Sequence, residues 1–224
     1  MARTIYIIRH AERMDDVDKN WREKVGNEYK SDNSPLSTQG HKQCVELAEW
    51  FKDIEVDHIF ASPFDRTLDT ATRMIGNRGI PIKPEAGFLE ALYFCEKPLG
   101  VRPLNILKET YPLIDETYNP VVNPWKEGFK DEDHDAFRDR IKDAIERILN
   151  KYEGDIIIIS HGSSIAVLLE ILTGNGSYVG QATVSKFVEK KNGKYEILSI
   201  ARYAHSSDKR NLRAWRFLFK CVIV

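Results

Sequence analysis

Short apolar runs alternate along the chain with longer stretches in which apolar residues recur at helical spacing. Four of the runs have the length and composition of buried β-strands: Thr4 to Ile8, Val56 to Ala61, Ile80 to Lys83 and Asp155 to Ser160. Two further runs, Thr183 to Glu189 and Lys194 to Ile200, flank Asn192-Gly193, a dipeptide typical of a β-hairpin turn. The pattern therefore predicts four separate strands followed by one hairpin.

Amphipathic stretches fill most of the intervals between these strands. They predict helices at Thr38 to Lys52, Pro63 to about Gly76, Asp133 to Tyr152 and Ser163 to Leu172. In the clearest of them, Phe137, Ile141 and Ile148 fall on one face. Alternating strands and helices favour an α/β fold, in which a mainly parallel sheet is covered on both faces and the hairpin adds an antiparallel element at one side.

Three segments do not follow this pattern. Asp15 to Asn33 is polar and charged, which predicts a long loop with at most one helical turn. Residues 84–132 contain six prolines and predict an irregular cap with one short helix, Leu104 to Thr110. Phe217 to Val224 is rich in β-branched and aromatic residues and predicts a terminal strand, while its last four residues, Cys221 to Val224, also have the form of a prenylation box with an atypical final residue.

Composition narrows the class of protein. The chain has 224 residues, of which 42% are hydrophobic and 30% charged, and these values suit one globular domain over residues 1–224. A net charge of −1 gives no global field toward nucleic acid, and the apolar runs are too short for stable membrane insertion. Cys44, Cys95 and Cys221 are too few for a disulfide framework or a zinc site, so we expect free thiols and a cytoplasmic protein. Any anion site must be built locally.

The candidate catalytic and binding residues come directly after the predicted strands or in the next helical turn. Arg9-His10 follows the first predicted strand, and His161-Gly162 follows the most apolar one. Arg66 falls in the first turn of the helix after a third strand. Ligands of such sheets bind beyond the carboxyl ends of the strands, so these side chains converge if the three strands are neighbours.

This set of residues favours a dianionic phosphate ligand. Guanidiniums bind phosphate oxygens in bidentate fashion, and helix N-termini at Pro63 and Ser163 are expected to add backbone N–H donors. Crowded cations keep an imidazole neutral, so His10 could attack phosphorus while His161 and the arginines hold the equatorial oxygens. Taken singly, each motif is more often structural: a surface Arg-His pair, a turn after a strand, or a cation on a helix surface.

Four short motifs carry a resemblance to a known family. Arg9-His10-Ala11-Glu12 resembles the signature of the histidine phosphatase (phosphoglycerate mutase-like) superfamily, whose usual form is Arg-His-Gly-Glu. The family's other blocks resemble, in the same order, Leu36-Ser37-Thr38-Gln39-Gly40, Ala61-Ser62-Pro63 with Arg66 and Thr70-Ala71, and Ser160-His161-Gly162. The resemblance implies a three-layer α/β/α sandwich, a covalent phosphohistidine and no cofactor.

Within this superfamily, Arg9 to Asp15 is similar to the phosphatase domain of the suppressor of T-cell signalling and ecdysteroid-phosphate phosphatase group. That resemblance implies that Arg13 also faces the phosphate. The segment from Ile114 to Pro120 is similar to part of that group's cap. True mutases usually have Ser or Thr where this chain has Arg13, followed by a nearby Trp-Asn.

These observations predict a metal-independent phosphomonoesterase. His10 is the expected nucleophile, and the phosphate pocket is expected to contain Arg9, Arg13, Arg66, His161 and Gly162. By its place in the family, Glu90 is the candidate acid, with Glu85 and Glu96 as competitors. The expected substrate is a phosphorylated small molecule or a phosphotyrosine protein, and a homodimer is possible. Two alternatives remain open: a phosphoglycerate mutase, or a binding module that keeps the pocket without turnover.

Overall fold

The computed structural model describes residues 2–26, 28–30, 32–191 and 193–202. Their centre is a six-stranded sheet with the order β3-β2-β4-β1-β5-β6. The strands are β1 (Thr4–Arg9), β2 (His58–Ala61), β3 (Ile82–Pro84), β4 (Ile156–Ser160), β5 (Val184–Glu189) and β6 (Tyr195–Arg202). The first four pair in parallel, and β5 and β6 form the predicted antiparallel hairpin beside β1.

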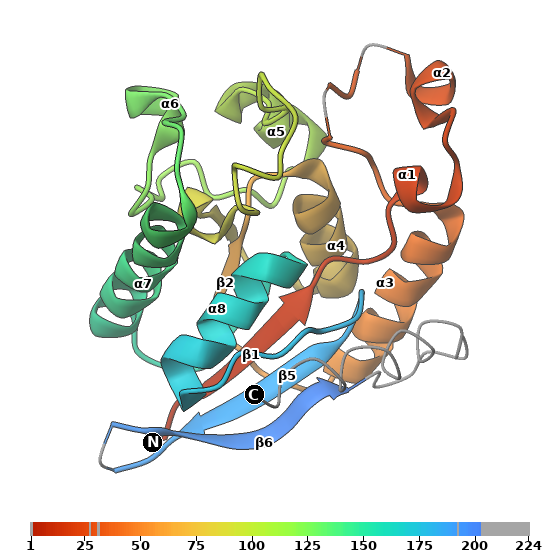
Figure 1. Cartoon of the computed structure of the whole chain (residues 1–224). Helices are drawn as coiled ribbons and strands as arrows, with labels where there is room; N and C mark the ends of the chain where they lie inside the picture. Colours follow the sequence, from red (N-terminus) through yellow and green to blue (C-terminus); the bar gives the residue numbers. More distant parts are fainter. Residues whose placement is uncertain (1, 27, 31, 192, 203–224) are drawn as a thin grey trace, which may run out of the picture.

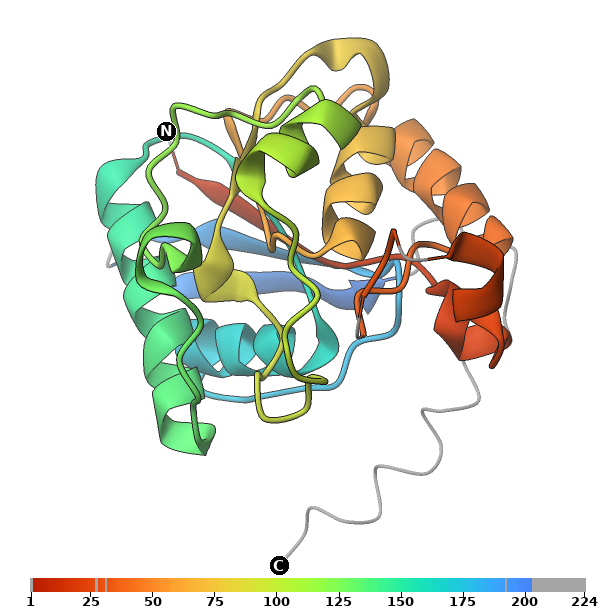
Figure 2. The same cartoon turned by 90° about the horizontal axis from the view of Figure 1, so that it is seen from above.

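Helices cover both faces of the sheet, which confirms the predicted three-layer sandwich (Figures 1 and 2). One face packs against α3 (Thr38–Phe51) and α4 (Asp65–Ile75), the other against α7 (His134–Lys151) and α8 (Gly162–Thr173). The side-chain alternation of β1 explains this arrangement: Tyr6 and Ile8 belong to the first core, while Ile5 and Ile7 belong to the second. All are buried, because a parallel strand between two helical layers is covered on both sides.

Several predicted boundaries were wrong. The segment Asp15 to Asn33 contains two short helices, α1 (Met14–Val17) and α2 (Trp21–Val25), because the indole of Trp21 is buried and anchors the second of them. Strands β2 and β3 each begin two residues later than expected. Helix α4 begins at Asp65 rather than at Pro63, since Phe64 is still extended. It ends as predicted, with Gly76 as its C-cap and the short 3₁₀ helix η1 (Gly76–Arg78) after it.

Residues 85–133 connect β3 to α7 and lie over the carboxyl ends of the parallel strands (Figure 1). This cap contains η2 (Ala86–Phe88), α5 (Leu104–Thr110) and α6 (Pro124–Glu127), so the helix predicted at Leu104 to Thr110 is confirmed and two short helices were missed.

Two buried carboxylates hold the cap: Asp65 at the start of α4 and Glu85 directly after β3. Asp65 accepts hydrogen bonds from Arg102 and Tyr111. Glu85 accepts them from the Tyr118 hydroxyl and from the backbone of the 121–122 segment. Burial raises the pKa of Glu85, against the opposing effect of these donors.

Two predictions concern the end of the chain. The terminal strand expected at Phe217 to Val224 and the prenylation box ending at Val224 lie outside the described residues. Within the described residues, none of the helices has both the length and the apolar character that a membrane span requires.

Candidate active site

Two histidines meet where β1 and β4 end. The register pairs Arg9 with Ser160, so His10 and His161 each stand one residue beyond the same point of the sheet. Their ring centroids are 5.3 Å apart, and both side chains are almost fully buried. Strand order β2-β4-β1 brings the third strand end, with Arg66, to the same place. The structure thus brings together the residues that the sequence placed at three strand ends.

Hydrogen bonds assign the protons of both imidazoles. His10 Nδ1 lies 2.8 Å from the carbonyl oxygen of Ala11, which can only accept, so Nδ1 carries the proton and Nε2 is left unprotonated. Arg66 Nε can only donate, and it lies 3.3 Å from His161 Nδ1. His161 Nε2 therefore carries the proton and donates to Ser62 Oγ at 2.7 Å.

Both histidines are uncharged at neutral pH. Burial is the main cause that holds the pKa of His10 well below its usual value of 6.5, and the positive charges of Arg66, Arg9 and Arg13 act in the same direction. The pKa of His161 is also held well below its usual value, first by burial and then by Arg66. A neutral His10 with a free Nε2 has the electronic state that a nucleophile needs.

Arg66 is the central cation of the site. Its side chain is 1% exposed, its guanidinium stacks over the Phe64 ring at 4.2 Å, and Nη1 donates to the Asp32 carbonyl at 3.2 Å. Burial, and next the charge of Arg13, lower the pKa of Arg66 to about 10. That value still leaves the guanidinium protonated at neutral pH, ready to bind an anion.

Arg9 contacts the loop that connects α8 to β5. Its Nη1 donates to the Tyr178 hydroxyl at 2.7 Å and to the Val179 carbonyl at 2.8 Å. Its Nε is buried and has no hydrogen-bond partner among the described residues. A Cβ at Gly162 would stand 3.3 Å from Arg9 Cζ, so glycine at this position leaves room for the guanidinium.

Arg13 lines the pocket but is already engaged. Its Nη2 lies 2.6 Å from Asp15 and its Nε 3.6 Å from Asp16. The three side chains are between 19% and 37% exposed, so solvent screens these ion pairs.

Glu90 is the pocket carboxylate. Its Oε1 accepts hydrogen bonds from the Ser163 hydroxyl and from the Ala91 amide. The two competitors point elsewhere: Glu85 is buried under the cap, and Glu96 pairs with Arg22 at the surface. Geometry therefore favours Glu90 over both of them.

The motif Leu36 to Gly40 contacts the motif Arg9 to Glu12 directly. Ser37 Oγ donates to the Glu12 carboxylate at 2.6 Å, and Ser37 N donates to the Glu12 carbonyl at 2.9 Å. A Cβ at Gly40 would stand 2.2 Å from that same carbonyl oxygen, so only glycine allows this close approach. Ala11, which departs from the usual glycine, is buried in the core, and its amide donates to Thr70 Oγ1 at 3.1 Å.

The helix N-termini differ from the prediction. Helix α8 begins at Gly162, with His161 as N-cap, and its first residues line the pocket. Helix α4 begins at Asp65, and the Asp65 amide is taken by Asn33 Oδ1 at 2.9 Å. The helix therefore starts two residues later than predicted, and its first amide holds the neighbouring loop.

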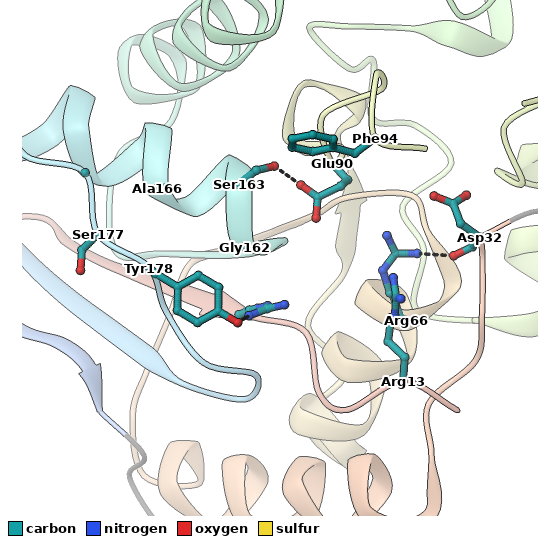
Figure 3. Close-up of a pocket in the computed structure, with 12 residues that line it drawn as sticks. Arg13, Asp32, Arg66, Glu90, Phe94, Gly162, Ser163, Ala166, Ser177 and Tyr178 are labelled. Atoms are coloured by element: carbon teal, nitrogen blue, oxygen red, sulfur yellow. Dashed lines mark hydrogen bonds between the residues drawn. The ribbon is translucent and has the colours of Figure 1, made fainter. Parts of the chain in front are cut away.

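These groups surround a pocket of about 620 Å³ (Figure 3). Its walls come from Arg9, Arg13, Arg66, Glu90, Gly162 and Ser163 together with Asp32, Phe94, Ala166, Gly176, Ser177 and Tyr178. Neither His10 nor His161 is among these lining residues, and both side chains are almost fully buried. Asp32, Phe94 and Tyr178 were missed, because each lies on an irregular segment with no motif to single it out. No cluster of metal-ligating side chains occurs in the described part of the chain.

Comparisons with known proteins agree with this geometry. The family model of the histidine phosphatase superfamily (branch 1) matches residues 5–206. The ecdysteroid-phosphate phosphatase of Drosophila melanogaster is 26% identical over 208 residues; the match covers 77% of this chain and 27% of the fly protein's length.

Solved structures share the fold. The ecdysone phosphate phosphatase of Bombyx mori, in complex with tungstate, has a TM-score of 0.71 at 19% identity and covers 95% of this chain and 99% of its own. The phosphoglycerate mutase of Bacillus anthracis has a TM-score of 0.59 at 22% identity and covers 89% of this chain and 93% of its own. At these identities the likeness shows a common fold alone.

Proposed function

Because the chain belongs to the histidine phosphatase superfamily, we propose that it is a phosphomonoesterase that forms a covalent phosphohistidine at His10. The observation that carries this proposal is the state of His10. Its imidazole is uncharged, its Nδ1–H is held by the Ala11 carbonyl, and its Nε2 is unprotonated. An unprotonated nitrogen beside a cluster of arginines is a nucleophile next to an anion site.

The reaction has two steps. First, His10 Nε2 attacks phosphorus, the bond from phosphorus to the ester oxygen breaks, and the Glu90 carboxylic acid gives its proton to the departing oxygen. Next, a water attacks the phosphohistidine, the Glu90 carboxylate takes the proton, and the nitrogen–phosphorus bond breaks to release inorganic phosphate.

Fixed guanidinium groups stabilise the negative charge of the phosphoryl group during its transfer. Arg66 and Arg9 hold the non-bridging oxygens, with Arg13 at the entrance and Gly162 at the start of α8. This set of guanidiniums supplies the positive charge that a divalent ion supplies in other phosphatases. We therefore extend the proposal to metal independence: activity survives EDTA, and added divalent ions do not raise it.

The two alternatives make different predictions. A mutase transfers the phosphoryl group between two positions of a glycerate, whereas a binding module shows neither hydrolysis nor transfer. The relative from Drosophila melanogaster is a phosphatase, and the sequence after His10 lacks the residues usual in mutases. For the substrate, we propose a phosphorylated small molecule or a phosphotyrosine protein.

The test is hydrolysis of p-nitrophenyl phosphate together with trapping of the intermediate. Turnover quenched in alkali leaves an acid-labile, alkali-stable phosphoryl group on the peptide that contains His10, and His10→Ala loses both the group and at least about 10⁴-fold in kcat/KM. His41→Ala is the matched control, since His41 lies on α3 and pairs with Asp69 away from the pocket. A phosphoryl group on serine, cysteine or aspartate overturns the mechanism, and binding of phosphate without turnover establishes the binding module.

A further inference from the structure

The loop that carries Glu90, residues 86–92, is held by an ion pair outside the pocket. We propose that Arg140 and Glu132 are positioning residues, which hold Glu90 where a departing ester oxygen can take its proton. The inference rests on the role proposed above for Glu90. Neither Arg140 nor Glu132 lines the pocket, so the pair can act on substrate only through the loop.

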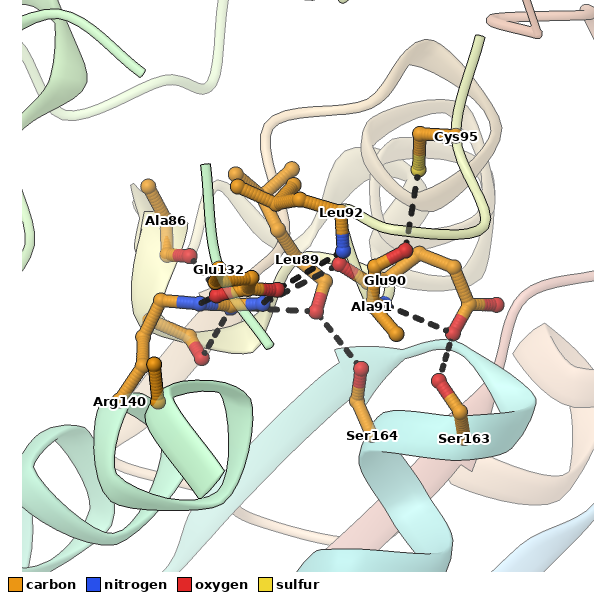
Figure 4. Close-up of polar contacts among 12 residues, drawn as sticks. Ala86, Leu89, Glu90, Ala91, Leu92, Cys95, Glu132, Arg140, Ser163 and Ser164 are labelled. Carbon is orange, nitrogen blue, oxygen red and sulfur yellow. Dashed lines mark hydrogen bonds and ion pairs between the residues drawn. The ribbon is translucent and has the colours of Figure 1, made fainter. Parts of the chain in front are cut away.

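Arg140, on α7, donates hydrogen bonds to four backbone carbonyl oxygens of this loop (Figure 4). Its Nη1 donates to the carbonyl oxygens of Ala86, Gly87 and Leu89 at 3.2, 3.0 and 3.2 Å. Its Nη2 donates to the carbonyl oxygen of Glu90 at 3.1 Å. One guanidinium thus sets the path of the backbone up to and including the acid.

Glu132 binds both Arg140 and the backbone of the loop. It binds Arg140 at both oxygens, with Nε at 2.8 Å and Nη2 at 2.7 Å, and it accepts the Leu92 amide at 2.8 Å. The pair therefore holds the backbone at Glu90 and again two residues later. The side chains of Arg140 and Glu132 are only 10% and 7% exposed.

Helix α8, which packs beside α7, holds the same loop through two serine side chains. Ser164 Oγ donates to the Leu89 carbonyl at 2.7 Å, and Ser163 Oγ donates to the Glu90 carboxylate. The Leu89 carbonyl thus receives a donor from each helix. With α7 fixing the backbone and α8 fixing the carboxylate, Glu90 has little freedom to leave the pocket wall.

An ion pair that only stabilises the fold would make the same contacts in the structure as one that positions Glu90. The two roles differ in their effect on the kinetics. A general acid contributes most when the leaving group is poor, so its displacement is felt on alkyl phosphates and much less on p-nitrophenyl phosphate. Loss of fold stability, or general loosening of the phosphate pocket, lowers both rates by a similar factor. The ratio of kcat/KM for the two substrates therefore separates positioning from bracing.

The experiment measures this ratio in Arg140→Gln and Glu132→Gln. We expect kcat/KM to fall at least about tenfold further on an alkyl phosphate than on p-nitrophenyl phosphate in both variants, because proton transfer to the ester oxygen depends on the placement of Glu90. In the Glu90→Gln background, Arg140→Gln should change the ratio no further, since the two residues act through one group. Equal losses on both substrates, or an additive double variant, overturn the proposal.

Arg138→Gln is the matched control. Arg138 also lies on α7 and makes a bidentate ion pair, with Glu170 on α8 at 2.6 and 2.8 Å, but it does not touch the loop. Its substitution should leave the ratio unchanged. Should Arg140→Gln unfold, Arg140→Lys takes its place, because lysine keeps the charge but lacks the planar fork that reaches several carbonyls.

The outcomes separate this proposal from the one it rests on. A wild-type protein that hydrolyses neither substrate defeats the proposed function itself. If Glu90→Gln shows the leaving-group effect and the Arg140 and Glu132 variants do not, Glu90 remains the acid and only the positioning role is lost.

Discussion

The two halves of the site are built in different ways. The floor, which we define as His10, Arg66 and His161, lies at or just beyond the ends of β1, β2 and β4, and its members are almost fully buried. The rim, which we define as Arg13, Asp32, Glu90, Phe94 and Tyr178, comes from irregular segments or their edges and borders the open pocket. The floor is fixed by the sheet and by the start of α4, whereas the rim is fixed by side-chain contacts to its irregular segments, such as those of Arg140 and Ser163 with Glu90.

This difference assigns different tasks to the two halves. In the floor, Arg66 donates to His161 and His161 donates to Ser62, so each group is oriented before substrate arrives. Such preorganisation suits the phosphoryl group, which every phosphomonoester shares. The rim faces the part of the substrate that varies, and we expect its variants to act selectively on leaving group or affinity.

The largest effect should come from the floor. Arg66→Ala should lower kcat/KM by about 10²-fold or more, roughly 3 kcal/mol, because it removes a fixed cation that binds the transferring group. The loss should be the same for alkyl and aryl phosphates. Steady-state kinetics on both substrates measure it, with Arg73→Ala as control, since Arg73 lies on the same helix but pairs with Asp69 at the surface. Near-normal kinetics in Arg66→Ala would remove Arg66 from the phosphate site.

A selective effect should come from Glu90→Gln in the rim. We expect a loss of about 10²-fold on an alkyl phosphate, whose poor leaving group needs a proton, and less than about tenfold on p-nitrophenyl phosphate. Kinetics on the two esters across a pH range provide the measurement. Equal losses on both would mean that Glu90 shapes the pocket without donating a proton, and the division between floor and rim would need to be redrawn.

Protonation of the floor should destabilise the fold. The pKa values of His10 and His161 lie well below 6.5 in the folded protein, mainly because both are buried, so the unfolded chain binds more protons once the pH falls below 6.5. Stability is therefore lost as the pH falls below 6.5, with a slope that approaches one proton taken up on unfolding for each of the two histidines. Urea unfolding at several pH values measures the slope, and His161→Gln should flatten it. An unchanged slope in that variant contradicts the assigned charge state.

The smallest effect should come from Arg13→Gln. Its guanidinium is partly exposed and already paired with Asp15, so its loss costs less than removal of a buried cation. We expect a rise in KM of less than about tenfold, with kcat nearly unchanged, and a weaker dependence of KM on salt. If Arg13→Gln lowered kcat as strongly as Arg66→Ala, Arg13 would belong to the floor.

The same division explains what the sequence reveals. The floor could be predicted because the most apolar runs locate the strands, and a charged residue directly after such a run must stand at the edge of the sheet. Glu90 needed the resemblance to a family, since no periodic pattern leads to it. Asp32 and Tyr178 could not be found, because their positions follow from long-range contacts among loops. The start of α4 was misplaced because proline is common in the first turn of a helix, whereas here the helix begins two residues after the proline at 63.

The pairing of Arg9 with Ser160 has a consequence for how this chain can vary in length. One residue added to β1 or β4 would move a histidine by about 3.3 Å along its strand and turn its side chain to the opposite face of the sheet. Insertions and deletions there disable the site at once, whereas the segment that carries α1 and α2 can lengthen or shorten without disturbing that register. That segment carries Asp32 at the pocket, so a change in its length would alter the rim while the distance between the two imidazoles stays fixed.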